Sequence, residues 1–155
     1  MGEIIKFEPA HFEHLVPREH LDTAGVEGWS VNGVLEHALT LAQSGPAFTY
    51  LSTQGEILAV SGATLVWPGV GWGWAFIDKR AFVDAAGLVH AFKRGIAGLM
   101  TEGCFHRLQA SVRADYYRGL RFAHLVGLKD DIVTLKHFGQ DRTDYILCAK
   151  IARLP

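Results

Sequence analysis

The sequence is poor in the features that mark secreted and membrane-spanning proteins. It has two cysteines, Cys104 and Cys148, which lie outside any Cys-x-x-Cys motif. Such spacing does not make a disulfide framework, so we expect two reduced thiols in or near the core. No run approaches the roughly 20 apolar residues of a membrane span, and the first residues do not form a signal peptide. We therefore expect a soluble, cytoplasmic protein with no membrane partner.

Charge of either sign is not in excess, and groups of metal ligands are scarce. The 15 basic and 16 acidic residues give a formal net charge of −1, which provides no field to hold a nucleic acid backbone. We expect no nucleic acid partner. His11 and His14 share one helical face and His20 follows, but no HExxH motif accompanies them. We expect structural histidines and no metal site.

The sequence does contain enough apolar residues to form one hydrophobic core. Its 155 residues are 49% hydrophobic and 20% charged, which is typical of a globular chain and unlike a disordered one. This length suits one ordinary domain and is too short for two. We expect a single domain over residues 1–155.

The chain is organised around residues 71–102. Residues 71–78 form a short aromatic and aliphatic run bounded by glycine, which is typical of a buried strand. Residues 81–100 then have apolar side chains at spacings of three and four, as in an amphipathic helix. The free amides of that helix's first turn, beside Lys79 and Arg80, predict an electropositive pocket for an anion.

Periodicity predicts further elements on both sides of this centre. Residues 18–29 are polar and broken by glycine, which predicts an irregular loop. The further strands that we expect are residues 3–7, 48–51, 56–67, 106–112, 132–138 and 145–151, with the last two paired as a hairpin. The further helices that we expect are residues 10–16, 33–43 and 114–126.

This order of elements resembles the GNAT acetyltransferase superfamily over nearly the whole chain. The likeness is greatest to a divergent branch of phage and prophage proteins, which share a segment like residues 57–62, a Trp67-Pro68-Gly69 turn and a tryptophan on the next strand. The resemblance implies an α/β (α+β) fold with a mixed, bent central sheet of six to seven strands and helices on both faces. It also implies that the fourth and fifth strands splay apart to admit the pantetheine arm of acetyl-CoA.

In the family, the loop before the third helix reads Gln/Arg-x-x-Gly-x-Gly/Ala, because its amides close on a pyrophosphate. A match that starts at Arg80 keeps the Arg and Ala85 but has Val83 in place of the first glycine. A match that starts at Phe82 keeps Gly87 but has no Arg or Gln. The cofactor-binding residues that the resemblance implies are Ile77, Lys79, Arg80, Ala85 and Gly87.

The family's usual general acid is a tyrosine four residues before a glycine on the last helix, and here that position is Ala123. A phenol or imidazole nearby can protonate a thiolate if it reaches the sulfur; the neighbouring candidates are Tyr116, Tyr117 and His124. Candidates for the general base are Glu56 and Asp78, which are otherwise carboxylates of a turn or helix cap. Trp67, Trp72 and Trp74 either wall a substrate pocket or pack the sheet.

Two hypotheses follow from the resemblance. The first is an acetyl-CoA-dependent N-acetyltransferase that acts on a small amine or a peptide amine. The alternative is a non-catalytic GNAT-fold protein of a phage or prophage, with a structural or interaction role. The sequence leaves the substrate open, and it leaves open a homodimer or, under the second hypothesis, a virion component.

Overall fold

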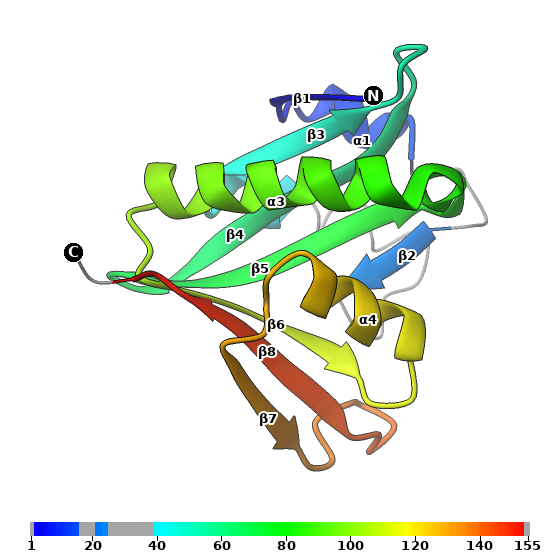
Figure 1. The fold of residues 1–155 in the computed structure, drawn as a ribbon. Coiled ribbons are helices and arrows are strands. Elements are labelled where there is room, and N and C mark those ends of the chain that lie inside the picture. The colour runs from blue at the N-terminus through cyan, green and yellow to red at the C-terminus, as the bar shows by residue number, and fades with distance from the viewer. Residues whose placement is uncertain (1, 16–20, 25–38, 154–155) are drawn as a thin grey trace.

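The strand β5 (Val70–Asp78) lies in the middle of a mixed sheet that has helices on both faces (Figure 1). The structure is a computed structural model that describes residues 2–15, 21–24 and 39–153, with only the backbone of 21–24. The other strands are β1 (Glu3–Lys6), β2 (Leu21–Ala24), β3 (Ala47–Leu51), β4 (Ile57–Trp67), β6 (Arg107–Arg113), β7 (Asp131–Leu135) and β8 (Tyr145–Ile151). The helices are α1 (Ala10–Glu13), the 3-10 helix η1 (Lys79–Asp84), α3 (Ala85–Glu102) and α4 (Tyr117–Leu125).

Seven strands follow one another in the order β1-β3-β4-β5-β6-β8-β7, and β2 lies off this path beside β5. Every pairing is antiparallel except that of β5 with β6, which is parallel. β7 and β8 form a terminal hairpin, with Asp131 opposite Ala149 and Leu135 opposite Tyr145. The predicted mixed sheet, its central strand and its last hairpin are therefore confirmed.

The alternation of side chains along β5 divides the core into two layers. Ala75 and Ile77 belong to the larger layer, which the helices α3 and α4 cover. Trp74 and Phe76 face the other way and pack with Phe12 of α1. Residues 39–43 are helical and lie in this second layer. Helices therefore cover both faces of the sheet, as the resemblance implied.

Several local predictions differ from the structure, including the strand 132–138, which is β7 and ends at Leu135, and the helix 114–126, which is α4 and begins at Tyr117. The predicted loop 18–29 contains β2, whose four residues show little alternation in sequence and are held by pairing with β5. The predicted helix 81–100 is two elements, because Asp84 has a non-helical backbone (φ −110°, ψ 71°) between η1 and α3. The predicted helix 10–16 is the shorter α1, and residue 16 lies outside the described residues. Residues 33–38 of the predicted helix 33–43 also lie outside them.

The expectation of two thiols in or near the core is correct for Cys148 and wrong for Cys104. Both cysteines are free; Cys104 is exposed, and burial raises the pKa of the Cys148 thiol. His11 Nδ1 lies 2.7 Å from the Thr49 hydroxyl, and His20 lies outside the described residues. The described part of the chain has no group of three or more residues arranged to hold a metal ion. It also has no helix with the length and apolar character needed to span a bilayer.

Candidate functional site

The site begins where β5 and β6 part. The two strands pair only at Val70–Trp72 of β5 and Arg107–Gln109 of β6. Beyond these residues β6 stays paired with β8, while β5 diverges toward the start of α3 (Figure 1). The sheet therefore opens between two adjacent parallel strands, which is the splay that the resemblance implied.

The outer half of β5 does not have a free edge. β2 pairs antiparallel with it, from Leu21 opposite Asp78 to Ala24 opposite Ala75. Ile77, whose backbone is a predicted contact of acetyl-CoA, lies opposite Asp22 in this ladder. A ligand arm that pairs with the same edge of β5 therefore has to replace β2.

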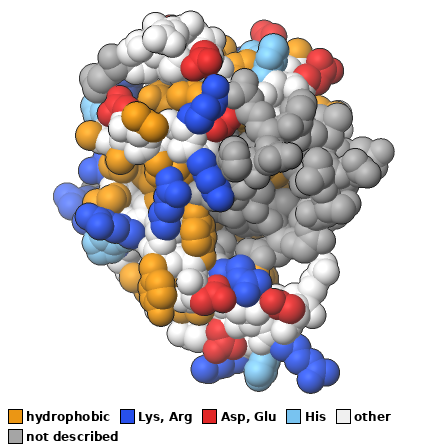
Figure 2. Space-filling model, turned by 90° about the vertical axis from the view of Figure 1, so that its right-hand side faces the viewer, with side chains coloured by type: hydrophobic (Ala, Val, Ile, Leu, Met, Phe, Trp, Pro, Cys, Tyr) orange, Lys and Arg blue, Asp and Glu red, His pale blue; other side chains and the backbone are white. Residues whose placement is uncertain are grey.

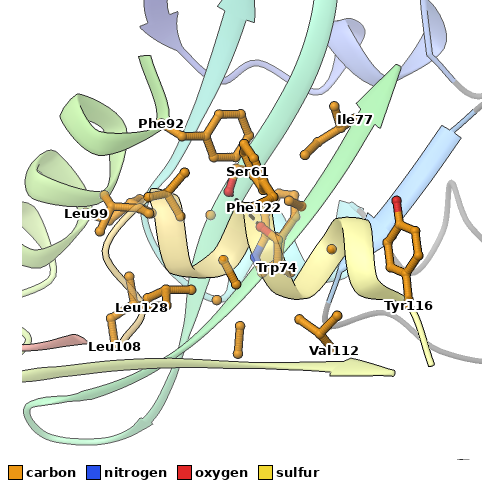
Figure 3. A pocket seen from close by; sticks show the side chains of 18 of the residues that line it. Ser61, Trp74, Ile77, Phe92, Leu99, Leu108, Val112, Tyr116, Phe122 and Leu128 are labelled. Atoms are coloured by element: carbon orange, nitrogen blue, oxygen red, sulfur yellow. Dashed lines mark hydrogen bonds between the residues drawn. The ribbon is translucent and has the colours of Figure 1, made fainter. Parts of the chain in front are cut away.

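An apolar cavity of about 70 Å³ lies between the diverging strands and the two helices α3 and α4 (Figure 3). Ile77, Val112 and Tyr116 lie toward one side of this cavity, and Leu99, Leu108 and Leu128 lie toward the other. The lining residues with a polar side-chain atom are Ser61, Trp74 and Tyr116. Ser61 Oγ donates a hydrogen bond of 2.7 Å to the Trp74 carbonyl oxygen. The cavity thus presents mainly hydrocarbon.

Trp74 has a buried hydrogen-bond donor without a partner. Its side chain is 2% exposed and stacks on Phe12, with ring centroids 6.2 Å apart. Its Nε1 has no hydrogen-bond acceptor in the part of the chain that the structure describes. An unpaired buried donor of this kind costs about 1–3 kcal/mol, so packing of the indole against its aromatic neighbours has to offset that cost.

The two helix starts beside the gap are capped by aspartates. Asp78 Oδ1 accepts a hydrogen bond of 3.0 Å from the Arg80 amide at the start of η1. Asp84 Oδ1 accepts one of 3.0 Å from the Gly87 amide at the start of α3. A Cβ at Gly87 would collide with the Asp84 carboxylate, so the glycine lets this cap close tightly. The carboxylates occupy the place that an anionic ligand takes at a helix start.

Arg80 is held by the same carboxylates that the sequence offered as general bases. Its guanidinium makes two hydrogen bonds of 3.2 Å to Asp78, whose side chain is buried. It also approaches Glu56 at 3.5 Å, where both side chains are about half exposed. Asp78 is therefore a helix cap and an ion-pair partner, and Glu56 is the more accessible of the two carboxylates.

The five predicted cofactor residues fall into two groups in space. Ile77 lies in the cavity wall. Lys79, Arg80, Ala85 and Gly87 follow it along η1 and the first turn of α3, and the side chains of the first three reach solvent. Figure 2 shows the molecule from the side toward which β5 runs in Figure 1, with several Lys and Arg side chains among hydrophobic ones.

Among the predicted proton donors, only Tyr116 lines the cavity. It stands at the start of α4, and its ring needs the space beside Gly119, where a Cβ would collide with it. Tyr117 is 79% exposed and His124 is also exposed. Ala123 lies in the cavity wall at the position of the family's tyrosine. The structure thus separates one candidate from the other two.

The three tryptophans do not form a common pocket. Trp74 is buried in the layer of α1. Trp72 stacks on Phe138, with centroids 6.4 Å apart, and Trp67 is 62% exposed at the end of β4. They lie in three different environments, so packing of the sheet accounts for Trp72 and Trp74.

Some features of the site were missed in the sequence. The cap at Asp84 has the signal of an aspartate three residues before a glycine amide in a helix's first turn, but the periodicity of residues 81–100 hid it. For Gly119, the sequence gives no indication of its role beyond the fact that it is a glycine. Arg118 lies over the Phe82 ring, with Cζ 3.7 Å from the centroid, and this pair joins α4 to η1 across the gap.

Comparisons with known proteins place the fold. No family model matches the sequence, and no curated protein matches it. A GNAT-family acetyltransferase from Streptococcus pneumoniae is similar in structure, with 16% identity over 99% of this chain and 100% of that one, and a TM-score of 0.68. The Escherichia coli ribosomal-protein-S18-alanine N-acetyltransferase has 17% identity over 100% and 96% of the chains, with a TM-score of 0.63.

A third similar structure is a point variant of the spermidine N-acetyltransferase from Vibrio cholerae. It has 10% identity over 97% of this chain and 93% of that chain, with a TM-score of 0.69. At these identities the similarity establishes the fold, and it runs over almost the full length of each chain. The protein has the fold of the GNAT-family N-acetyltransferases.

Proposed function

We propose that the protein is an acetyl-CoA-dependent N-acetyltransferase that acts on a small amine or a peptide amine. The observation that carries this proposal is the parting of β5 from β6 over an apolar cavity, in a chain with the GNAT fold. An extended ligand would lie between the two strands once it replaces β2 on the edge of β5, and the cavity would give its apolar end a place below. The neighbouring structures are named as acetyltransferases of different amines, so the amine of this protein stays open.

Acyl-CoA would supply an activated thioester, whose acyl carbon gains a bond to the amine nitrogen and loses its bond to sulfur. The backbone around Ile77 would polarise the thioester carbonyl, because an amide aimed at a developing oxyanion stabilises it. The Tyr116 hydroxyl would donate a proton to the leaving sulfur, since Tyr116 stands at the cavity wall. The proton that the amine loses would pass to Glu56 or to solvent, which keeps the reaction balanced.

The phosphates would bind at the start of α3, beside Lys79, Arg80, Ala85 and Gly87. This part fits less well than the apolar part, because the Asp84 carboxylate already accepts from the Gly87 amide. A phosphate on that amide would have to turn the carboxylate away. Binding should therefore be weak in the native chain and stronger when the negative charge of Asp84 is removed.

Calorimetry and thermal unfolding with acetyl-CoA test the proposal on the native protein and on Asp84→Asn. The asparagine retains an oxygen that can cap the helix but removes the charge, so we expect acetyl-CoA to bind about tenfold more tightly. The matched control is Asp131→Asn, which removes one negative charge far from the gap, at the β7 edge. Absence of both heat and a melting shift at millimolar acetyl-CoA, in the native protein and in Asp84→Asn, would reject the proposal.

The second candidate is a GNAT-fold interaction protein without catalysis. It is favoured by the same capped helix starts, because Asp78 and Asp84 fill the positions where an anion would bind. The phage or prophage role remains a prediction that no comparison supports. A gene position among virion genes, together with no binding of acetyl-CoA, would favour this candidate over the enzyme.

A further inference from the structure

The cavity below the gap is larger than an acetyl group requires. Its volume is about 70 Å³, and residues of β4, β5, η1, α3, β6 and α4 line it. An apolar cavity of about 150 Å³ in another protein stays dry and holds a six-carbon ring. By that scale, this cavity suits a chain of roughly three carbons. Water would gain little there, because most of the wall has no polar side-chain atom.

Small residues on facing elements explain why the space is open. Ala123 of α4 and Ala110 of β6 are both buried in the wall, and Gly73 of β5 is part of it. A Cβ at Gly73 would lie 3.6 Å from the nearest atom, in ordinary contact, so the backbone alone does not fill this region. A large side chain at Ala123 would enter the same space. The small side chain of Ala123 is therefore one of the features that leave the cavity open.

The two ends of the cavity are lined by different residues. Ile77, Val112 and Tyr116 mark the side where β5 and β6 have parted, and Leu108 and Leu128 mark the far side (Figure 3). A thioester held beside Ile77 and Tyr116 would have its carbonyl at the first side. The rest of its acyl chain would then extend toward the far side, among Phe92, Leu108 and Phe122.

We propose that the acyl group which this protein takes is a short chain longer than acetyl, with the cavity as its chain-binding site. This inference rests on the proposed function. Each methylene that enters the cavity should strengthen binding about fourfold, because its apolar surface leaves water. Because the methyl of an acetyl group already takes the place of one of these three carbons, the gain should stop after roughly two added methylenes, when the space is full.

The test is calorimetry of the full chain with acetyl-, propionyl-, butyryl-, pentanoyl- and octanoyl-CoA. We expect affinity to rise by a total of about 16-fold from acetyl- to butyryl-CoA, and to rise no further with pentanoyl- or octanoyl-CoA. If acetyl-CoA binds and longer thioesters bind no better, the inference is wrong and the proposed function stands. If no thioester binds, both are wrong.

Two variants test directly whether the cavity binds the acyl chain. Ala123→Leu should fill the space and reduce the ratio of butyryl- to acetyl-CoA affinity to about one. Gly73→Ala adds one methyl and should lower that ratio about fourfold, and it serves if Ala123→Leu does not fold. The matched control is Gly98→Ala in α3, which does not line this cavity and where a Cβ meets no atom within 4 Å. An unchanged ratio in both cavity variants would overturn the inference.

Discussion

The two halves of β5 both consist mainly of apolar residues and glycine, but they pair with different strands. At Val70–Trp72 the strand is paired on one edge with β4 and on the other with β6, both long strands of the central sheet. At Ala75–Asp78 the edge of β5 that does not face β4 pairs instead with the four-residue β2. This strand lies off the path of the other seven strands. The first half is thus fixed by the fold, and the second is held by a short segment that a ligand can replace.

The largest expected effect is at the end of the outer half, where Asp78 pairs with Arg80. Arg80→Ala would leave the buried Asp78 carboxylate without its guanidinium, so we expect the free energy of unfolding to fall by about 2–3 kcal/mol. We take less than the full penalty of a buried pair because the Arg80 side chain is 44% exposed. Denaturant unfolding measures this.

The control for that experiment is Arg121→Ala, which removes an exposed arginine from α4 and should change stability by less than about 0.5 kcal/mol. Equal effects of the two substitutions would show that the Asp78–Arg80 pair does not hold the end of β5. From the sequence alone, Arg80 is either a phosphate ligand or a solvated residue. Its ion pair with Asp78 gives Arg80 a structural role in addition to either of these.

A glycine pair compares the part of β5 that pairs with β6 with the residue just beyond it. A Cβ at Gly71 would lie 2.8 Å from the Phe105 ring, whereas one at Gly73 would lie 3.6 Å from its nearest neighbour. Gly71→Ala should therefore destabilise the protein by about 1–3 kcal/mol through overpacking. Gly73→Ala should be neutral or stabilise by up to about 1 kcal/mol, because alanine restricts the unfolded chain. Denaturant midpoints in the opposite order would contradict the difference in packing.

Proline substitutions in β2 test whether the outer half can be released. Successive residues of a strand direct their amides to opposite edges, so only one of Asp22→Pro and Thr23→Pro removes a hydrogen bond to β5. That variant should lose about 1 kcal/mol of pairing and bind acetyl-CoA about fivefold more tightly. The other proline is its control. Calorimetry that gives the native affinity for both variants would show that β2 and the ligand do not compete.

The smallest expected effect is at the far edge of the sheet, which exposed ion pairs hold. Hydrogen bonds from the Thr143 side chain and from Arg113 lower the pKa of Asp141 to about 2. The native pKa lies below the unfolded value of about 3.9, so this stabilisation is present above about pH 4 and is lost as the pH falls toward 2. The melting temperatures of the native protein and Asp141→Asn should converge over that range. A constant difference would exclude the ion pair as its cause.

Much of the fold was predictable because it depends on local patterns. The alternation in residues 145–151 and the helical spacing within residues 81–100 are set by burial of one face. The strand formed where its period indicated, and α3 forms the predicted helix from Ala85 onward. β2 was not predictable in this way. Leu21–Ala24 is a strand only because β5 offers an edge, and that edge is free only because β6 diverges.

The candidate site was predictable in part. Ile77 and Tyr116, two of the residues named from the resemblance, lie in the wall of the cavity, as does Ala123, whereas Tyr117 and His124 are exposed. The spacing of residues 81–100 predicted open amides at a helix start, but it contains no information on which carboxylate turns toward them. Asp84 is one residue before α3, and only its backbone angles bring its carboxylate to the Gly87 amide.

The pairing of β2 with β5 also affects how tightly any ligand of that edge is seen to bind. A segment tethered in the same chain is present beside its partner at an effective concentration on the order of millimolar. The measured dissociation constant therefore equals the intrinsic one divided by the fraction of molecules whose β2 is detached. If one molecule in a hundred is detached, a ligand of micromolar intrinsic affinity titrates at about 100 μM. Weak binding at this edge would then reflect how firmly the four residues Leu21–Ala24 pair with β5 as much as the intrinsic affinity of the ligand.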